Sequence, residues 1–293
     1  MTNMHITPAL VILINDVQKR SDFIMPIPPG THILHTVQGG DTLYQIANRY
    51  ESDVEAIVEA NGIYPPFTDP YLIFPGQVLI VPKIISNLSN TLYVVQNGDT
   101  VGSIAFRFSA HPDLLIGTNY SIQNPNYIFP NQQLLLPAYI YEIESGDTLS
   151  GISTRTGASI EEILRANANR PAISPDLIYP GTQMIIPLPS SRNIIVTQPL
   201  PGSSVSDGSI LEGYARAFEA NVLYRLLDFN QNEIIEETFT TAEYGAPTYG
   251  RFRTNLTFDR APSTQRGELQ VYTRSAQDGS VQDLVRLGIQ FNT

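Results

Sequence analysis

The stretch VQGGDTLYQIANRY, residues 37–50, places a Gly-Asp-Thr turn between an extended run and a short helix. Its apolar side chains recur at the i, i+3, i+4 and i+7 spacing of a one-sided helix. The stretch returns as VQNGDTVGSIAFRF over residues 95–108 and as ESGDTLSGISTRTG over residues 144–157. A sequence that repeats one supersecondary unit predicts a tandem array of a single small fold.

A second shared segment closes each copy. Working outward from the turn, an asparagine follows the turn glycine at the same distance every time: Asn61, Asn119 and Asn167. A Pro-Gly or Pro-Asn turn then starts a β-rich run: FPGQVLIVP (74–82), FPNQQLLLP (129–137) and YPGTQMIIP (179–187). Fixed spacing at both ends with a variable middle indicates one fold with one adjustable loop.

The second helix of each copy has its own start signal. Ser52 with Glu55, and Ser159 with Glu162, have the spacing of a capping box, which satisfies free amides at a helix start. The middle copy instead has Pro112, a residue suited to the first helical position. Each unit is therefore predicted to run strand, helix, helix, strand.

The three copies resemble lysin motif (LysM) domains, over about residues 35–187. In that family two antiparallel strands carry both helices on one face. The family binds glycans that contain N-acetylglucosamine, such as peptidoglycan or chitin, in a shallow groove. The groove lies between the loop after the first strand and the loop before the last. The resemblance implies the same fold and ligand class here.

This resemblance places the two groove loops on specific residues of each copy. The implied glycan-binding residues are Gly40, Asp41, Thr42, Leu43, Ile73, Phe74 and Pro75; Gly98, Asp99, Thr100, Val101, Ile128 and Phe129; and Gly146, Asp147, Thr148, Leu149, Ile178 and Tyr179. Gly-Asp-Thr is also a good turn and helix cap, so a structural role for the aspartates stays open. The middle copy departs most from the family pattern, at Gly102, Gly117 and Asn131, and is the one expected to have lost binding if any has.

The pattern of apolar and polar residues changes after the third copy. Seven short alternating runs separated by turn signals predict an antiparallel β-sandwich: IIVTQ, ILEGYARAF, NVLYRLLD, EIIEETFTT, GRFRTNLTF, ELQVYTRSA and VRLGIQF. The patterns VTQPLPGSSVS, GYARAFEANV and GAPTYGRF resemble the immunoglobulin-like domain of bacterial spore-germination and envelope proteins (Gmad2). That resemblance implies a fold but no ligand, so a protein partner is one option for this domain.

The net charge and the length of the apolar runs limit the classes of partner that the chain is expected to bind. The 293 residues carry a formal net charge of −11, which disfavours nucleic acid and anionic lipid and favours a polymer of neutral or mixed charge. No apolar run reaches the length needed to span a membrane. The sequence thus predicts a glycan partner, with no nucleic acid and no membrane span.

No residue pattern indicates an enzyme, a cofactor or a metal site. The chain has no cysteine and four histidines, of which His32 and His35 are close in sequence but lack a third ligand at suitable spacing. Two pairs of carboxylates, at residues 161–162 and 236–237, are expected on solvated faces rather than across a glycosidase cleft. With the repeats and the sandwich assigned, no segment remains for a catalytic domain.

The first thirty residues fit neither family. PALVILIN, residues 8–15, is apolar and β-prone, and it lacks the basic start of a secretory signal. It is expected to pack on the chain's own repeats or to add to a sheet edge of a neighbouring chain, which would give self-association. An atypical signal is the third option.

These observations predict an α+β protein of three tandem βααβ LysM repeats and a C-terminal seven-stranded immunoglobulin-like sandwich. The expected parts are an arm (1–30), the repeats (31–82, 92–137 and 140–187) and the sandwich (193–293). The short connection between the second and third copies predicts that these two pack together. The expected function is non-catalytic glycan binding in a bacterial cell envelope or spore layer, reached without a clear secretory signal. The alternative is a structural subunit of an appendage or tail-like assembly.

Overall fold

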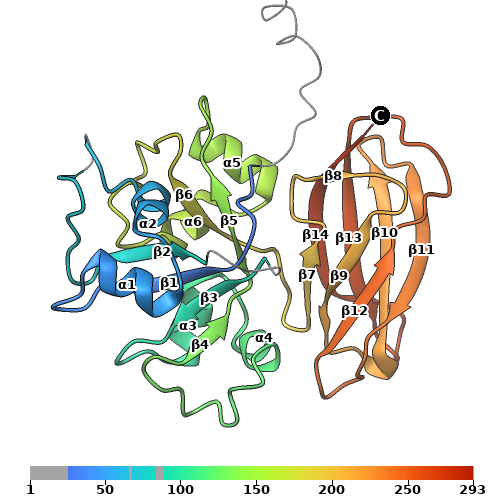
Figure 1. Ribbon diagram of the computed structural model, residues 1–293. Coiled ribbons are helices and arrows are strands. Elements are labelled where there is room, and N and C mark those ends of the chain that lie inside the picture. Colours follow the sequence, from blue (N-terminus) through green and yellow to red (C-terminus); the bar gives the residue numbers. More distant parts are fainter. Residues whose placement is uncertain (1–25, 66–67, 84–88, 293) are drawn as a thin grey trace, which may run out of the picture.

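The computed structural model describes residues 26–65, 68–83 and 89–292 as a body of three repeats beside an elongated sandwich (Figure 1). Each repeat runs strand, helix, helix, strand, as predicted. The elements are β1 (His32–Thr36), α1 (Leu43–Tyr50), α2 (Val54–Asn61) and β2 (Val78–Pro82); β3 (Thr91–Val94), α3 (Val101–Arg107), α4 (Pro112–Gly117) and β4 (Gln133–Leu135); and β5 (Ala138–Glu142), α5 (Leu149–Thr156), α6 (Ile160–Ala166) and β6 (Gln183–Pro187). No helix of the described part is long and apolar enough to cross a membrane.

The threonine of each Gly-Asp-Thr turn starts the first helix of its repeat. The Thr42, Thr100 and Thr148 side chains each accept a backbone N–H of the first helical turn. The predicted capping box of Ser159 and Glu162 is confirmed at α6.

The second predicted capping box, at the start of α2, is wrong. The N-cap is Asp53, whose carboxylate accepts the N–H groups of the next turn. The Ser52 hydroxyl instead donates to the Pro82 carbonyl and ties the helix start to the end of β2. Aspartate is as good an N-cap as serine, so the sequence allowed the helix to start after either Ser52 or Asp53. The packing of Ser52 against the end of β2 selects Asp53.

A sheet that crosses from the first repeat into the second was not foreseen. Its order is β2-β1-β3-β4, with β1 antiparallel to β2, β3 antiparallel to β4, and β1 parallel to β3. Each two-stranded repeat leaves an open edge, and parallel pairing of β1 with β3 removes two of those edges. The third repeat keeps its own pair, β5 antiparallel to β6.

All three repeats share one core. Its buried members come from each copy, and they include Leu34 and Ile80, Tyr93 and Leu134, and Ile140 and Ile185. The short second connection does bring the second and third repeats together, because the Arg165 guanidinium lies 4.4 Å from the Phe106 ring centroid. The repeats therefore form one packed body rather than separate modules on a string.

Residues 26–30 are the described end of the predicted N-terminal arm. The Pro26 carbonyl accepts the Glu142 N–H at 2.8 Å, and Ile27 packs against the core of the third repeat. This end of the arm therefore lies along β5. The predictions for residues 8–15 fall outside the described residues.

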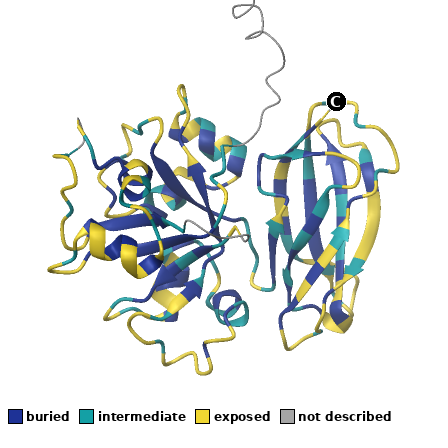
Figure 2. Cartoon of the chain, viewed as in Figure 1, coloured by how far each residue is buried: buried dark blue, intermediate teal, exposed yellow. Residues whose placement is uncertain are grey.

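The C-terminal domain is a two-sheet sandwich with one more strand than predicted. One sheet has the order β11-β10-β13-β14-β8 and the other β12-β9-β7. The strands are β7 (Ile194–Gln198), β8 (Ser204–Val205), β9 (Ile210–Ala215), β10 (Asn221–Asp228), β11 (Glu233–Thr241), β12 (Gly250–Asn255), β13 (Arg266–Arg274) and β14 (Val281–Phe291). The additional strand, β8, has two residues and was too short to give a pattern. Its core is one cluster of buried residues from both sheets, and the buried positions along the strands are dark blue in Figure 2.

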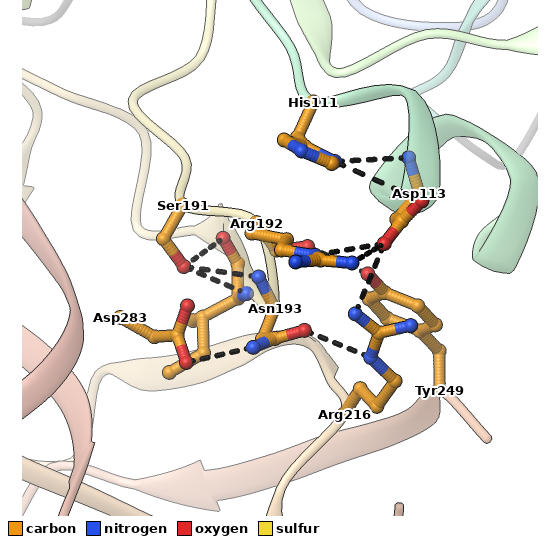
Figure 3. Close-up of polar contacts among 9 residues, drawn as sticks. His111, Asp113, Ser191, Arg192, Asn193, Arg216, Tyr249 and Asp283 are labelled. Atoms are coloured by element: carbon orange, nitrogen blue, oxygen red, sulfur yellow. Dashed lines mark hydrogen bonds and ion pairs between the residues drawn. The ribbon is translucent and has the colours of Figure 1, made fainter. Parts of the chain in front are cut away.

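Charged and aromatic groups join the sandwich to the second repeat (Figure 3). The Asp113 carboxylate at the start of α4 pairs with Arg192 at 2.6 Å and with Arg216 at 3.3 Å. The buried Tyr249 ring packs against Gly117, and its hydroxyl donates to the Arg192 carbonyl at 2.6 Å. Gly117 is thus explained by this contact and gives no indication that the second repeat has lost its ligand.

We expect Gly117→Ala to loosen this junction. A Cβ at this position would lie 2.0 Å from Tyr249 Cδ2, so the ring must move. Overpacking of this kind costs about 1–3 kcal/mol. Limited proteolysis within residues 188–193 should become faster, whereas Gly102→Ala, whose Cβ has space, should behave as wild type. Equal cleavage rates for the two variants would contradict the prediction.

Candidate functional site

Backbone hydrogen bonds hold the two predicted loops of each repeat side by side. In the first repeat the Val37 N–H donates to the Gln77 carbonyl and the Gly76 N–H donates to the Val37 carbonyl, both at 2.9 Å. The same two bonds recur in the other copies, in the second between Val95 and residues 131–132 and in the third between Ile143 and residues 181–182. The structure therefore brings together, in every copy, the residues that flank the two segments that the resemblance assigned to the groove.

The first loop turns at a glycine with positive φ. Gly40, Gly98 and Gly146 have φ of 89°, 88° and 92°, a conformation that a side chain would strain. A Cβ at any of the three would meet nothing within 4 Å. Backbone atoms here face open space, so a ligand can approach them closely.

The aspartate of each turn points into its own repeat. Asp41 Oδ2 accepts the Gln38 N–H at 2.8 Å and lies 2.8 Å from His35 Nε2. The equivalent partners of Asp99 are the Gln96 N–H and the Tyr93 hydroxyl, and those of Asp147 are the Glu144 N–H and the Tyr141 hydroxyl. The side chains of Asp41 and Asp147 are 7% and 5% exposed. These carboxylates therefore stabilise the conformation of the loop from its buried side.

The ionisation of the first repeat's network follows from its burial. Burial lowers the pKa of His35, although Asp41 opposes the shift, so the imidazole is neutral at neutral pH. Burial by itself would raise the pKa of Asp41, but the hydrogen bonds from Gln38 and His35 lower it below its ordinary value. A neutral His35 then donates from Nε2 to the carboxylate, and Nδ1 accepts from the Tyr50 hydroxyl.

The apolar residues of the predicted site divide into core and surface. Leu43, Val101 and Leu149 are buried and belong to the repeat cores. Ile73, Ile128, Ile178 and Tyr179 are half-buried, and Pro75 is exposed. Phe74 and Phe129 are 53% and 65% exposed, beside the second-loop turn. Two of the three copies thus offer an aromatic ring to a ligand at this edge.

The second-loop turn needs a positive φ after its proline. Gly76 and Gly181 supply it with φ of 87° and 84°, and Asn131 adopts 69° in the second copy. Asparagine is one of the side chains that tolerate this region. The departure of the second copy at Asn131 therefore keeps the same turn.

In each repeat one asparagine, here called the asparagine clamp, connects the second helix to the last strand. The sequence shows the constant spacing of this asparagine but does not predict its contacts. The Asn61 amide nitrogen donates to the Ile57 and Ile80 carbonyls, and its oxygen accepts the Ile80 N–H, all within 2.8 Å. Asn119 and Asn167 make the same three bonds between their second helix and last strand. Invariant spacing from the turn glycine was the available signal.

The carboxylate pairs singled out in the sequence have local partners. Glu161 pairs with Arg165, and Glu162 closes the α6 capping box. On β11, Glu236 and Glu237 pair with Arg260 and Arg274. Within the described residues no group of three His, Asp or Glu side chains could hold a metal ion.

Comparison with known proteins agrees with this architecture. The LysM domain family matches residues 35–82, 93–137 and 141–187, and the family described as an immunoglobulin-like domain of bacterial spore germination (Gmad2) matches residues 193–280.

Among curated proteins, the chain is 28% identical over 174 residues to the N-acetylmuramoyl-L-alanine amidase sle1 of Staphylococcus epidermidis, covering 52% of this chain and 50% of that protein. It is 28% identical to the secreted LysM effector ECP6 of Passalora fulva, covering 54% and 78%. Thus the chain spans half the length of the sle1 amidase that it matches.

A solved structure, the Bacillus cereus spore cortex-lytic enzyme SleL, is 30% identical over 36% of this chain and 22% of that one, with a TM-score of 0.27. The two family matches and the two loop-bearing edges of each βααβ unit lead to one assignment. The chain carries three LysM domains followed by an immunoglobulin-like domain of the Gmad2 family.

Proposed function

We propose that the chain binds an N-acetylglucosamine-containing polymer through its LysM loop pairs, without catalysing a reaction on it. The observation that carries the proposal is the paired backbone bonding of the two loops in all three repeats. It leaves the glycine backbone of the first loop facing open space, next to an exposed aromatic ring in two of the copies.

The chemistry of these loops suits a neutral sugar. Because the aspartates are turned inward, the first loop offers mainly backbone N–H and C=O groups, which can pair with acetamido and hydroxyl groups. Phe74 and Phe129 can cover the apolar faces of sugar rings. The net charge of −11 disfavours strongly anionic polymers.

Similar proteins support a wall-associated role. The relatives include an autolysin of Enterococcus faecalis, 30% identical over 56% of this chain and 26% of that protein. They also include a putative sporulation-specific glycosylase of Bacillus subtilis, 34% identical over 33% of this chain and 22% of that protein. We place this chain in a bacterial cell envelope or spore layer, where the LysM domains bind peptidoglycan or a chitin-like polymer and hold the Gmad2 domain there.

Co-sedimentation with insoluble peptidoglycan, and separately with chitin, tests the proposal. The wild-type chain should pellet, and soluble N-acetylglucosamine oligomers should release it. The double variant Phe74→Ala/Phe129→Ala should bind about tenfold more weakly, because two ring contacts of about 0.5–1 kcal/mol each are lost. Phe218→Ala is the matched control, since Phe218 is 68% exposed but lies in the sandwich. A folded chain that pellets with neither polymer would refute the function.

A further inference from the structure

A cleft of about 820 Å³ lies where the third LysM domain meets the end of the sandwich. One wall is the outer face of α5, with Ser150 and Thr154 one helical turn apart. The other wall comes from the turn after β10, the start of β13 and the end of β14. The cleft therefore requires both domains.

This cleft begins next to the first loop of the third repeat. Helix α5 begins at Leu149, the last residue of the first loop, and Ser150 already lines the cleft. Arg155 also lines it, and the same guanidinium pairs with Asp147 of the Gly-Asp-Thr turn at 2.5 Å. One helical turn thus separates the proposed sugar-binding loop from the sandwich wall.

The sandwich wall offers neutral hydrogen-bonding groups and one exposed ring, beside the guanidinium of Arg266. Phe229 is 72% exposed. Three glutamines line the same wall, and their amide groups have no hydrogen-bond partner among the described residues: Gln231, Gln265 and Gln290. Amides that both donate and accept, next to an aromatic face, complement the hydroxyl, acetamido and C–H groups of a sugar.

The carboxylates of the cleft have partners elsewhere. Asp228 accepts from Ser263 and from Asn232, and these bonds lower the pKa of its carboxyl group. Glu268 lies 3.5 Å from Arg286 and accepts from Gln270. The groups left for a ligand are therefore the amides, the ring, the hydroxyls of α5 and the guanidinium of Arg266, which also lines the cleft.

We propose that this cleft binds the next sugar units of the glycan strand held by the third LysM domain, so that the Gmad2 domain is part of the glycan site. The inference rests on the proposed function and deepens it. It implies that recognition by the third repeat grows with strand length, because only a longer strand reaches from the loops to Phe229.

Isothermal titration of the full chain with N-acetylglucosamine oligomers, a trimer and an octamer, tests this. The Phe74→Ala/Phe129→Ala background weakens the first two repeats, so the third repeat contributes a larger share of the binding. In this background, Phe229→Ala should weaken octamer binding about two- to fivefold, the size of one lost ring contact, and leave trimer binding unchanged. Gln231→Ala should act in the same direction. Phe239→Ala is the matched control, since Phe239 is 63% exposed on β11 and does not line the cleft.

The outcomes separate the two proposals. Octamer binding that is equal in the Phe229→Ala, Gln231→Ala and control variants would overturn the cleft while leaving LysM binding intact. The cleft proposal would also be overturned if the Phe74→Ala/Phe129→Ala chain, without a further substitution, bound the octamer no more tightly than the trimer. If neither oligomer binds the wild-type chain, the glycan-binding function fails together with the inference.

Discussion

Asn167→Ala is expected to lower the free energy of unfolding of the three-repeat body by about 3–5 kcal/mol. The Asn167 amide nitrogen donates to the Ile163 and Ile185 carbonyls, and its oxygen accepts the Ile185 N–H. The oxygen also accepts from Arg170 Nη1 at 2.9 Å. Asn167 is 2% exposed, so water cannot replace these bonds. Each buried group left without a partner costs about 1–3 kcal/mol.

Differential scanning calorimetry of the full chain measures this effect. The transition of the repeats should shift to lower temperature, while that of the sandwich moves little. Asn97→Ala is the control, because Asn97 is exposed in the turn of the second repeat. Asn119→Ala should lower the stability of the repeats less than Asn167→Ala, since no arginine of the described residues donates to Asn119. A repeat transition that is unchanged in Asn167→Ala would show that the clamp does not carry stability.

Much of the repeat fold could be predicted because its determinants are local. The threonine caps, the i, i+3, i+4, i+7 faces and the Pro-Gly turns each act within a few residues. The loop pairing follows from them, since two antiparallel strands of fixed length bring Val37 beside Gln77. Asn131 shows where pattern alone misleads, because a departure from the family keeps the same turn with φ of 69°.

Contacts between distant segments could not be predicted from one sequence. The parallel pairing of β1 with β3 depends on which open edges meet, and neither strand encodes that choice. The inward turn of the aspartates depends on ring partners six residues earlier, His35, Tyr93 and Tyr141, which differ in chemistry between copies. Gly117 is one of the departures that made the second copy the one expected to have lost binding if any has, but a contact with Tyr249, far away in the sequence, accounts for it.

Arg170 links the first and third repeats by hydrogen bonds. Arg170 is 4% exposed. Nη1 donates to Asn167 Oδ1 and to the Gln183 carbonyl, and Nη2 donates to Asn61 Oδ1 and to the Ala60 carbonyl. It thus connects the asparagine clamps of two repeats. Burial lowers the pKa of Arg170 to about 9, which still leaves it charged at neutral pH. No carboxylate pairs with it in the part of the chain that the structure describes.

Arg170→Ala should therefore cost about 3–5 kcal/mol, because it removes four hydrogen bonds and leaves a cavity between two repeats. Arg170→Met restores most of the volume but none of the bonds, so it separates packing from hydrogen bonding. If the bonds dominate, both variants lose similar stability in calorimetry, and the exposed Arg286→Ala control loses none.

The position of the defect gives a second readout. The Val78 N–H donates to the Asn169 carbonyl across the same junction at 2.9 Å, so its amide hydrogen exchange should accelerate in both Arg170 variants. The Gly288 carbonyl accepts the Gly202 N–H inside the sandwich, and exchange at Gly202 should stay at the wild-type rate. Wild-type exchange at Val78 in Arg170→Ala would mean that the first and third repeats are held together by their shared core alone. Faster exchange in Arg170→Ala but not in Arg170→Met would assign the junction to packing volume, because the methionine variant lacks every hydrogen bond of the arginine.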